Sequence, residues 1–103
     1  MVDSTIGQTP LIKLEKLFPH SEIEFYGKLE ALNPGGSIKD RTALRIIQEA
    51  LKNGSIKQGD TVIESSSGNM AIGLAQACLY YDLKLIVVVD PLVNNQTVKI
   101  LKA

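Results

Sequence analysis

The chain has 103 residues, 45% of them hydrophobic and 21% charged, which is typical of one globular domain with one core. Lysine and arginine together number 11, as do aspartate and glutamate, so the net charge is 0. A neutral chain has no electrostatic footprint for nucleic acid or for an anionic membrane surface. Neither is expected as a partner.

Cysteine and histidine occur once each, which excludes several kinds of site. Cys78 alone forms no internal disulfide and no multi-cysteine metal site, and its apolar neighbours predict a core position. His20 alone gives little basis for a histidine metal cluster or a Ser-His triad, so no metal is expected. The sequence contains neither a run of 18 apolar residues nor a secretory signal pattern, which favours a cytoplasmic protein.

Hydrophobic periodicity predicts short strands that alternate with helices. Within residues 61–89 it predicts a strand, a helix and a second strand, which together form a βαβ unit. The last strand is an uninterrupted apolar run, as found in parallel sheets that are covered on both faces. The fold expected is therefore α/β, with a parallel sheet between two helical layers. The predicted strands are residues 11–14, 23–30, 61–64 and 85–89, and the predicted helices are residues 37–52, 70–79 and 94–103.

Residues 33–41 combine a turn with the start of a helix. Pro34 keeps the residue before it out of helical geometry, and the two glycines after it permit backbone angles that other residues resist. Ser37 is a favourable N-cap, and Asp40 follows in the capping-box position.

Lys39 then falls in the first turn of the predicted helix. A cation there faces the positive end of the helix dipole, which together with a dry environment would favour a neutral amine. A neutral amine can attack a carbonyl carbon. The local pattern by itself favours the alternative, an ordinary solvated lysine whose stem lies along the helix, since most lysines are exposed.

A second helix start follows the strand predicted at residues 61–64. Free backbone amides, the Ser66 and Ser67 hydroxyls and the Asn69 amide would suit a carboxylate or a phosphate there. The alternative is a serine-rich N-cap without a ligand. Ligands of open parallel sheets bind at the carboxyl ends of the strands, so this loop and Lys39 are expected to face one crevice.

Four motifs extend this interpretation: Ile6-Gly7-Gln8-Thr9-Pro10-Leu11, Lys28-Leu29-Glu30, Asn33-Pro34-Gly35-Gly36-Ser37-Ile38-Lys39-Asp40-Arg41 and Ser66-Ser67-Gly68-Asn69. In this order and spacing they resemble the cysteine synthase family of pyridoxal-phosphate (PLP) enzymes, over nearly the whole chain. The resemblance implies part of a fold-type II PLP enzyme, a three-layer αβα fold like that of the tryptophan synthase β subunit. It also implies that Lys39 forms the internal Schiff base and that Asn69 hydrogen-bonds the 3′-oxygen of the cofactor.

The resemblance also implies which residues hold the substrate carboxylate: Ser66, Ser67, Gly68, Asn69 and Met70. Met70 departs from the common pattern, because cysteine synthases usually carry at this place a threonine that helps to bind the carboxylate. With this methionine, the run Asn33-Pro34-Gly35-Gly36-Ser37 and the segment Val88-Val89-Asp90-Pro91, the chain looks more like the branch that makes an aminocarboxyethyl-glutamate precursor of diaminopropionate for siderophores.

The chemistry implied is β-replacement on O-acetylserine or O-phosphoserine through an aminoacrylate intermediate. The product would be cysteine or a compound of the N-(2-amino-2-carboxyethyl)-glutamate type. In this scheme Lys39 first anchors the cofactor and then, once freed, removes the Cα proton of the amino-acid substrate.

Family members are much longer than this chain, so the resemblance implies an amino-terminal fragment without turnover of its own. Residues 1–32 would provide strands of the large domain and residues 33–103 part of the small, mobile domain. The glycine-rich loop for the cofactor phosphate comes later in family members, and the full-length protein would be a homodimer. A hypothesis of another class is a short or degenerate module that binds an anion or a partner without catalysis.

Overall fold

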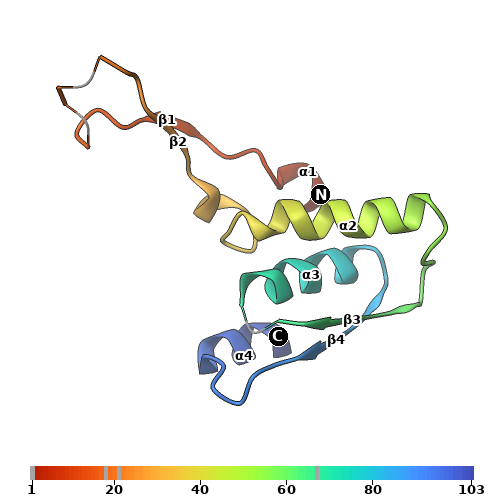
Figure 1. Ribbon diagram of the computed structural model, residues 1–103. Coiled ribbons are helices and arrows are strands. Elements are labelled where there is room, and N and C mark those ends of the chain that lie inside the picture. Colours follow the sequence, from red (N-terminus) through yellow and green to blue (C-terminus); the bar gives the residue numbers. More distant parts are fainter. Residues whose placement is uncertain (1, 18, 21, 67) are drawn as a thin grey trace.

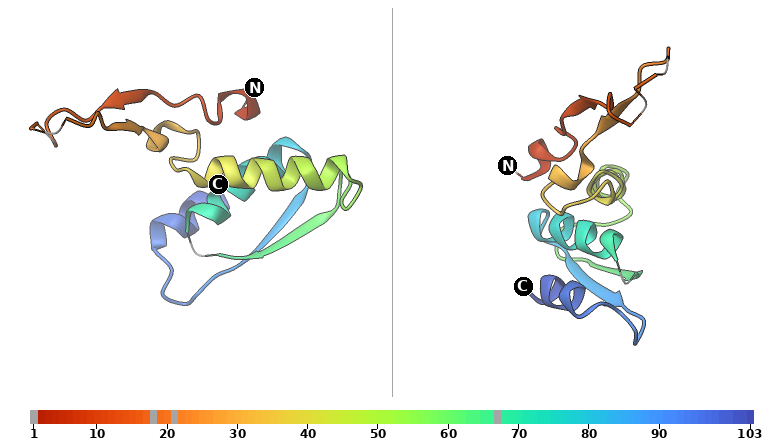
Figure 2. Two further views of the ribbon diagram at one scale, coloured as in Figure 1. Left: turned by 45° about the horizontal axis from the view of Figure 1, so that its top comes forward. Right: turned by 90° about the vertical axis from the view of Figure 1, so that its left-hand side faces the viewer.

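The computed structural model describes residues 2–17, 19–20, 22–66 and 68–103. It is elongated, with principal extents of 53 × 35 × 20 Å, because a hairpin projects from a layered body (Figures 1 and 2). None of the helices in these ranges is long and apolar enough to cross a membrane. In chain order the elements are α1 (Val2–Thr5), β1 (Leu11–Lys13), β2 (Tyr26–Lys28), the 3-10 helix η1 (Glu30–Leu32), α2 (Lys39–Lys52), β3 (Thr61–Ser65), α3 (Asn69–Tyr80), β4 (Lys84–Val88) and α4 (Asn95–Lys102).

The predicted βαβ unit is present. Strands β3 and β4 pair in parallel, with Thr61 opposite Lys84 and Ser65 opposite Val88, and α3 connects them. Helix α3 packs on the sheet and α2 packs on α3, so the body is layered as helix, helix and sheet (Figure 1). Both strands begin or end within one residue of their predicted bounds.

Burial alternates along the sheet, as the two-residue period of a strand requires. Val62 and Leu85 are partly buried against the core, whereas Ile63, Ile86 and Val88 are 65%, 51% and 55% exposed. The sequence predicted helices on both faces. Within the described residues they cover one face, so the apolar run of β4 leaves its other face open.

The hydrophobic core lies between α2 and α3. The side chains of Ala43 and Ile47 meet those of Ala77 and Cys78, each no more than 3% exposed. Cys78 therefore has the predicted core position, and burial raises the pKa of its thiol. The cluster of buried residues is Ala43, Ile47, Leu74, Ala77, Cys78 and Leu83.

The N-terminal hairpin is shorter than predicted. Strands β1 and β2 pair antiparallel from Leu11 opposite Lys28 to Lys13 opposite Tyr26. The second strand was expected over residues 23–30, but η1 begins at Glu30, and the ladder covers three residue pairs. The hairpin extends away from the helices in every view of Figures 1 and 2. Its apolar side chains consequently remain exposed, Leu11 to 62%.

The start of α2 differs from the predicted capping box. The helix begins at Lys39, whose backbone N–H donates to Ser37 Oγ at 3.1 Å, so Ser37 does accept an amide of the first turn. Asp40 turns back instead to accept from the backbone N–H of Gly35 at 2.5 Å. The two-glycine turn places that amide beside the carboxylate, which the spacing of a capping box does not anticipate. At the other end, Gly54 has a φ of 81°, as a left-handed helix terminus requires.

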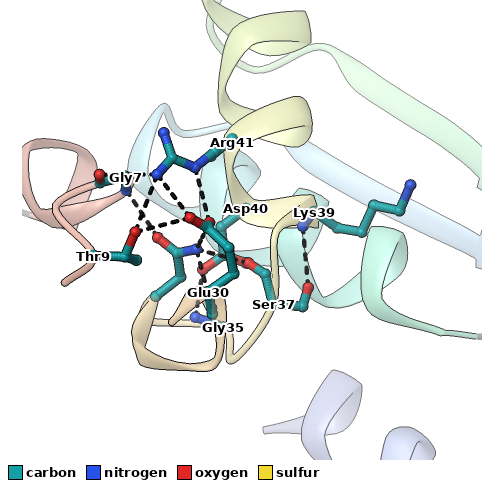
Figure 3. Close-up of polar contacts among 9 residues, drawn as sticks. Gly7, Thr9, Glu30, Gly35, Ser37, Lys39, Asp40 and Arg41 are labelled. Atoms are coloured by element: carbon teal, nitrogen blue, oxygen red, sulfur yellow. Dashed lines mark hydrogen bonds and ion pairs between the residues drawn. The ribbon is translucent and has the colours of Figure 1, made fainter. Parts of the chain in front are cut away.

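An anchor network of five residues (Gly7, Thr9, Glu30, Asn33 and Arg41) ties the N-terminal segment to the turn before α2 (Figure 3). Arg41 donates from Nε and Nη2 to the two oxygens of Glu30, both at 2.8 Å, and from Nη2 to the Gly7 carbonyl at 3.0 Å. The Asn33 amide donates to Glu30 Oε2 at 2.6 Å and to the Ser37 carbonyl at 3.0 Å. Segments as distant as residues 7 and 41 are thereby fixed to one another.

The network perturbs the acidity of Glu30. Hydrogen bonds, above all from Arg41, lower the pKa of the Glu30 carboxyl from 4.5 to about 2, although partial burial opposes them. The Glu30 hydrogen bond likewise raises the pKa of Arg41. Both members therefore stay charged across the neutral range.

Ile47→Ala is expected to lower the free energy of unfolding by about 2–4 kcal/mol, because it leaves a cavity between α2 and α3. The matched control is Ile46→Ala, whose side chain on the same helix is 50% exposed, and its expected cost is below about 1 kcal/mol. Urea unfolding followed by circular dichroism measures both. Equal losses for the two variants would contradict this assignment of the core.

Glu30→Gln is expected to reduce the acid sensitivity of the fold. As the pH falls from 4.5 towards 2, the unfolded chain takes up a proton at residue 30 that the folded chain does not. The stability contributed by this carboxylate is therefore complete at neutral pH and lost within that window. The variant lacks this contribution at every pH, so its urea midpoint should decline less steeply in acid. Glu49→Gln, which removes an exposed pair with Arg45 on α2, is the control and should follow the parent. If the urea midpoints of the parent and of Glu30→Gln fell equally steeply with decreasing pH, this prediction would be wrong.

Candidate functional site

Lys39 is the first residue of α2 and is exposed to solvent. Its backbone N–H donates to Ser37 Oγ, while its side chain extends away from the anchor network (Figure 3). In the described part of the chain, the Lys39 amine takes part in no hydrogen bond or ion pair. The backbone is thus fixed and the amine is accessible, which suits an attachment point for a carbonyl group.

The predicted anion cradle, residues 66–70, joins the end of β3 to the start of α3. Ser66 donates its backbone N–H to the Val88 carbonyl at 3.1 Å, and its Oγ accepts from Gly68 N at 3.4 Å. The N-cap of α3 is Gly68, which has no side chain with which to cap the helix. Among the described residues no side chain caps α3, which leaves its first amides open to an anion. Ser67, also predicted for this site, lies outside the described residues.

Asn69 and Met70 form the first turn of α3 but differ in their surroundings. Asn69 is exposed, so its amide is free to reach a ligand at the helix start. Met70 is half-buried and packs against the core. At that position an apolar side chain contributes packing and has no hydroxyl to offer.

Gly73 brings Lys39 and the cradle together. A Cβ at Gly73 would lie 3.0 Å from the Lys39 carbonyl oxygen and 3.1 Å from Ala43 Cβ, so the backbones of α2 and α3 touch here. Asn69 precedes Gly73 by four residues and therefore lies on the same face of α3, one turn nearer the helix start. The two helix starts predicted to face one crevice are consequently adjacent.

Sequence reasoning missed the positioning role of three elements, and for one of them, Asp40, it predicted a capping box instead. One is Gly73, for which a glycine inside a helical pattern is itself a signal of close approach. The others are the Glu30–Arg41 pair and the buried Asp40, whose partners depend on tertiary structure. No group of three or more His, Cys, Asp or Glu side chains in the described ranges is placed to hold a metal ion.

The residues present fit one part of a PLP molecule. An accessible amine on a fixed backbone suits its aldehyde, and an exposed asparagine one helical turn from the backbone contact suits a ring oxygen. Arg41 directs its Nε and Nη2 donors to Glu30, Thr9 and Gly7. These donors already have partners and are not free for the cofactor phosphate.

The chain is similar to known proteins over most of its length. Residues 2–103 match the family model described as "Pyridoxal-phosphate dependent enzyme". N-(2-amino-2-carboxyethyl)-L-glutamate synthases from Ralstonia nicotianae and Cupriavidus metallidurans are 50% and 47% identical to this chain over 97 and 98 residues. These matches cover 94% and 95% of this chain and 29% of each relative.

The chain also matches a solved structure. The crystal structure of O-ureido-L-serine synthase has a TM-score of 0.89 at 35% identity, covering 98% of this chain and 32% of that one. The chain thus spans about a third or less of the length of the proteins it matches. It belongs to the family of pyridoxal-phosphate dependent enzymes and has the α/β fold of their fold-type II, cysteine synthase-like members.

Proposed function

We propose that this chain carries the cofactor lysine and the substrate-carboxylate cradle of a PLP-dependent β-replacement enzyme that acts on an activated serine. The observation that carries the proposal is the contact of the Lys39 carbonyl with Gly73, one helical turn from Asn69. It brings an accessible amine and an uncapped helix start to one place. Such an enzyme needs both close together, the amine to attach the cofactor and the helix start to bind the substrate carboxylate.

In this proposal Lys39 would hold PLP through its amine, and Asn69 would donate to the ring oxygen. When bound, PLP supplies an electron sink for the pair left at the substrate Cα. The substrate carboxylate would be held by Ser66, Ser67, Gly68, Asn69 and the backbone amide of Met70. The Cα proton would then point at Lys39 Nζ, which would accept it as general base once it is released from the cofactor.

The substrate would be O-acetylserine or O-phosphoserine, whose acetate or phosphate leaves from Cβ. For the incoming group, we favour the amine of glutamate over sulfide, so the product would be N-(2-amino-2-carboxyethyl)-glutamate and not cysteine. Met70 supports this choice, because its side chain packs inward where cysteine synthases usually present a hydroxyl. The names of the two relatives described above support it as well.

The same proposal includes a cytoplasmic homodimer that supplies a siderophore precursor. It also includes a division of the chain at residue 32, with residues 1–32 contributing to a large domain and residues 33–103 to a small, mobile one. The projecting hairpin supports this division, since its exposed apolar side chains would have a partner surface in a larger domain (Figure 2).

Borohydride treatment of the natural protein that contains this sequence is expected to fix PLP covalently on Lys39, as read by peptide mass spectrometry. Lys39→Ala should abolish the adduct, because no amine remains at the start of α2. The matched control is Lys52→Ala, which removes the last lysine of the same helix. A PLP adduct on another lysine would refute the assignment. No adduct on any lysine would favour the non-catalytic anion-binding or partner-binding module.

Met70→Thr is expected to shift nucleophile choice towards sulfide. A threonine hydroxyl would add a hydrogen bond at the cradle, and we expect the ratio of sulfide to glutamate products to rise about tenfold. A competition assay with both nucleophiles and O-acetylserine measures the ratio by mass spectrometry. A strong preference of the unsubstituted protein for sulfide would show that the branch assignment is wrong.

A further inference from the structure

Asp40 is a buried acid directly beside the cofactor lysine. Its residue is 1% exposed, and its side chain is among the largest that are fully buried. Burial of a carboxylate is unfavourable unless its oxygens are paired, so the position requires a physical explanation. Its place in the first turn of α2 gives favourable interaction with the helix dipole, which offsets part of that penalty.

The two oxygens of Asp40 have different surroundings. Oδ2 accepts from the backbone N–H of Gly35 at 2.5 Å and so closes the turn that leads into Lys39 (Figure 3). Oδ1 is buried and has no hydrogen-bond partner in the part of the chain that the structure describes. A buried acceptor without a partner carries an uncompensated desolvation penalty, so a hydrogen bond to this oxygen would be favourable.

A donor on α3 lies next to that oxygen. Gly35 packs so closely that a Cβ built on it would overlap both Asp40 Oδ1 and Gln76 Nε2. The carboxylate oxygen and the amide nitrogen therefore lie on the same side of Gly35. Gln76 belongs to α3 and follows Asn69 by seven residues, about two helical turns, so the two share a face of the helix. A small movement of α3 against α2 would join Gln76 to Asp40.

We propose that Asp40 is a positioning residue that couples Lys39 to the cradle, with Gln76 as its partner. Oδ2 holds the turn at Gly35, and Oδ1 accepts from the Gln76 amide when substrate occupies the start of α3. In this proposal α3 would shift as one element, so that occupation of the cradle near Asn69 would be transmitted through Gln76 to the backbone of Lys39. This inference rests on the proposed function, which gives the cradle and Lys39 a common substrate.

The first test separates geometry from charge. In Asp40→Ala the turn loses its acceptor, so hydrogen exchange at the Gly35 amide of the cofactor-free protein should accelerate at least about tenfold. Asp40→Asn keeps an oxygen for Gly35, and its amide can pair with a reoriented Gln76 side chain. It should therefore retain slow exchange and most of the activity. The matched control is Asp60→Asn. Asp60 also accepts a backbone N–H, from Lys57, but it lies just before β3, at the end of that strand away from the cradle. This variant should leave exchange at Gly35 unchanged.

The second test isolates Gln76 with Gln76→Met, which keeps the length of the side chain and removes the amide. Since that amide is not bonded to Asp40 in this structure, exchange at Gly35 should stay unchanged without substrate. With O-acetylserine, kcat and the substrate-induced change in cofactor absorbance should fall about tenfold, with KM altered less than about threefold. The double variant Asp40→Ala/Gln76→Met should have the same kcat and the same absorbance change as Asp40→Ala alone.

The control for the second test is Gln48→Met. It removes the hydrogen bond from Gln48 of α2 to the Tyr81 hydroxyl, 2.9 Å long, at the end of the helices remote from Lys39. It should lower the melting temperature and leave the absorbance change intact. Additive losses in the double variant, or full activity of Gln76→Met, would overturn the coupling. If PLP is absent from Lys39 in the unsubstituted protein, the proposed function fails, and unaccelerated exchange in Asp40→Ala would overturn the role of Asp40 separately.

Discussion

The paired hydrogen bonds between Arg41 and Glu30 determine where Lys39 can be. Arg41 follows Lys39 by two residues in the first turn of α2, and Glu30 lies at the end of the hairpin, so their contact fixes the helix start against the N-terminal segment. Two parallel hydrogen bonds between charged groups set the orientation as well as the distance. Asn33 extends the constraint by donating both to Glu30 and to the carbonyl of Ser37, the residue whose hydroxyl receives the Lys39 amide.

Close approach of α2 and α3 supplies the second constraint. Gly73 and Ala43 have small or absent side chains where the helices cross, and larger residues such as Ile47 fill the space further along. The helix starts are consequently near each other, and the Gln48–Tyr81 hydrogen bond links the chain at the opposite ends. Packing of this kind tolerates little change in volume, so the separation of Lys39 from the cradle is set by the core as well as by the turn.

Local patterns predicted much of this fold, and the exceptions have physical reasons. The βαβ unit was predictable because its strands and helix differ in period and length, and the positions of Lys39 and Asn69 followed from motifs of specific spacing. The Glu30–Arg41 pair was not predictable, because eleven residues separate its members and no periodicity relates them. Asp40 matched the spacing of a capping box, yet its partner is Gly35, since the turn bends the backbone towards it. The open face of the sheet was not predicted either. An apolar strand indicates that both of its faces are covered, but it does not indicate whether the covering segment lies nearby in the sequence.

The hairpin of β1 and β2 stands clear of the helices and joins the body through Glu30 and the turn that follows (Figure 1). The hydrogen bonds of Arg41 with Glu30 and Gly7 connect the two ends of the hairpin to the first turn of α2. A displacement of β1 and β2 would therefore act on the few hydrogen bonds that orient the start of α2. A partner surface that binds the hairpin would thereby influence the orientation of Lys39.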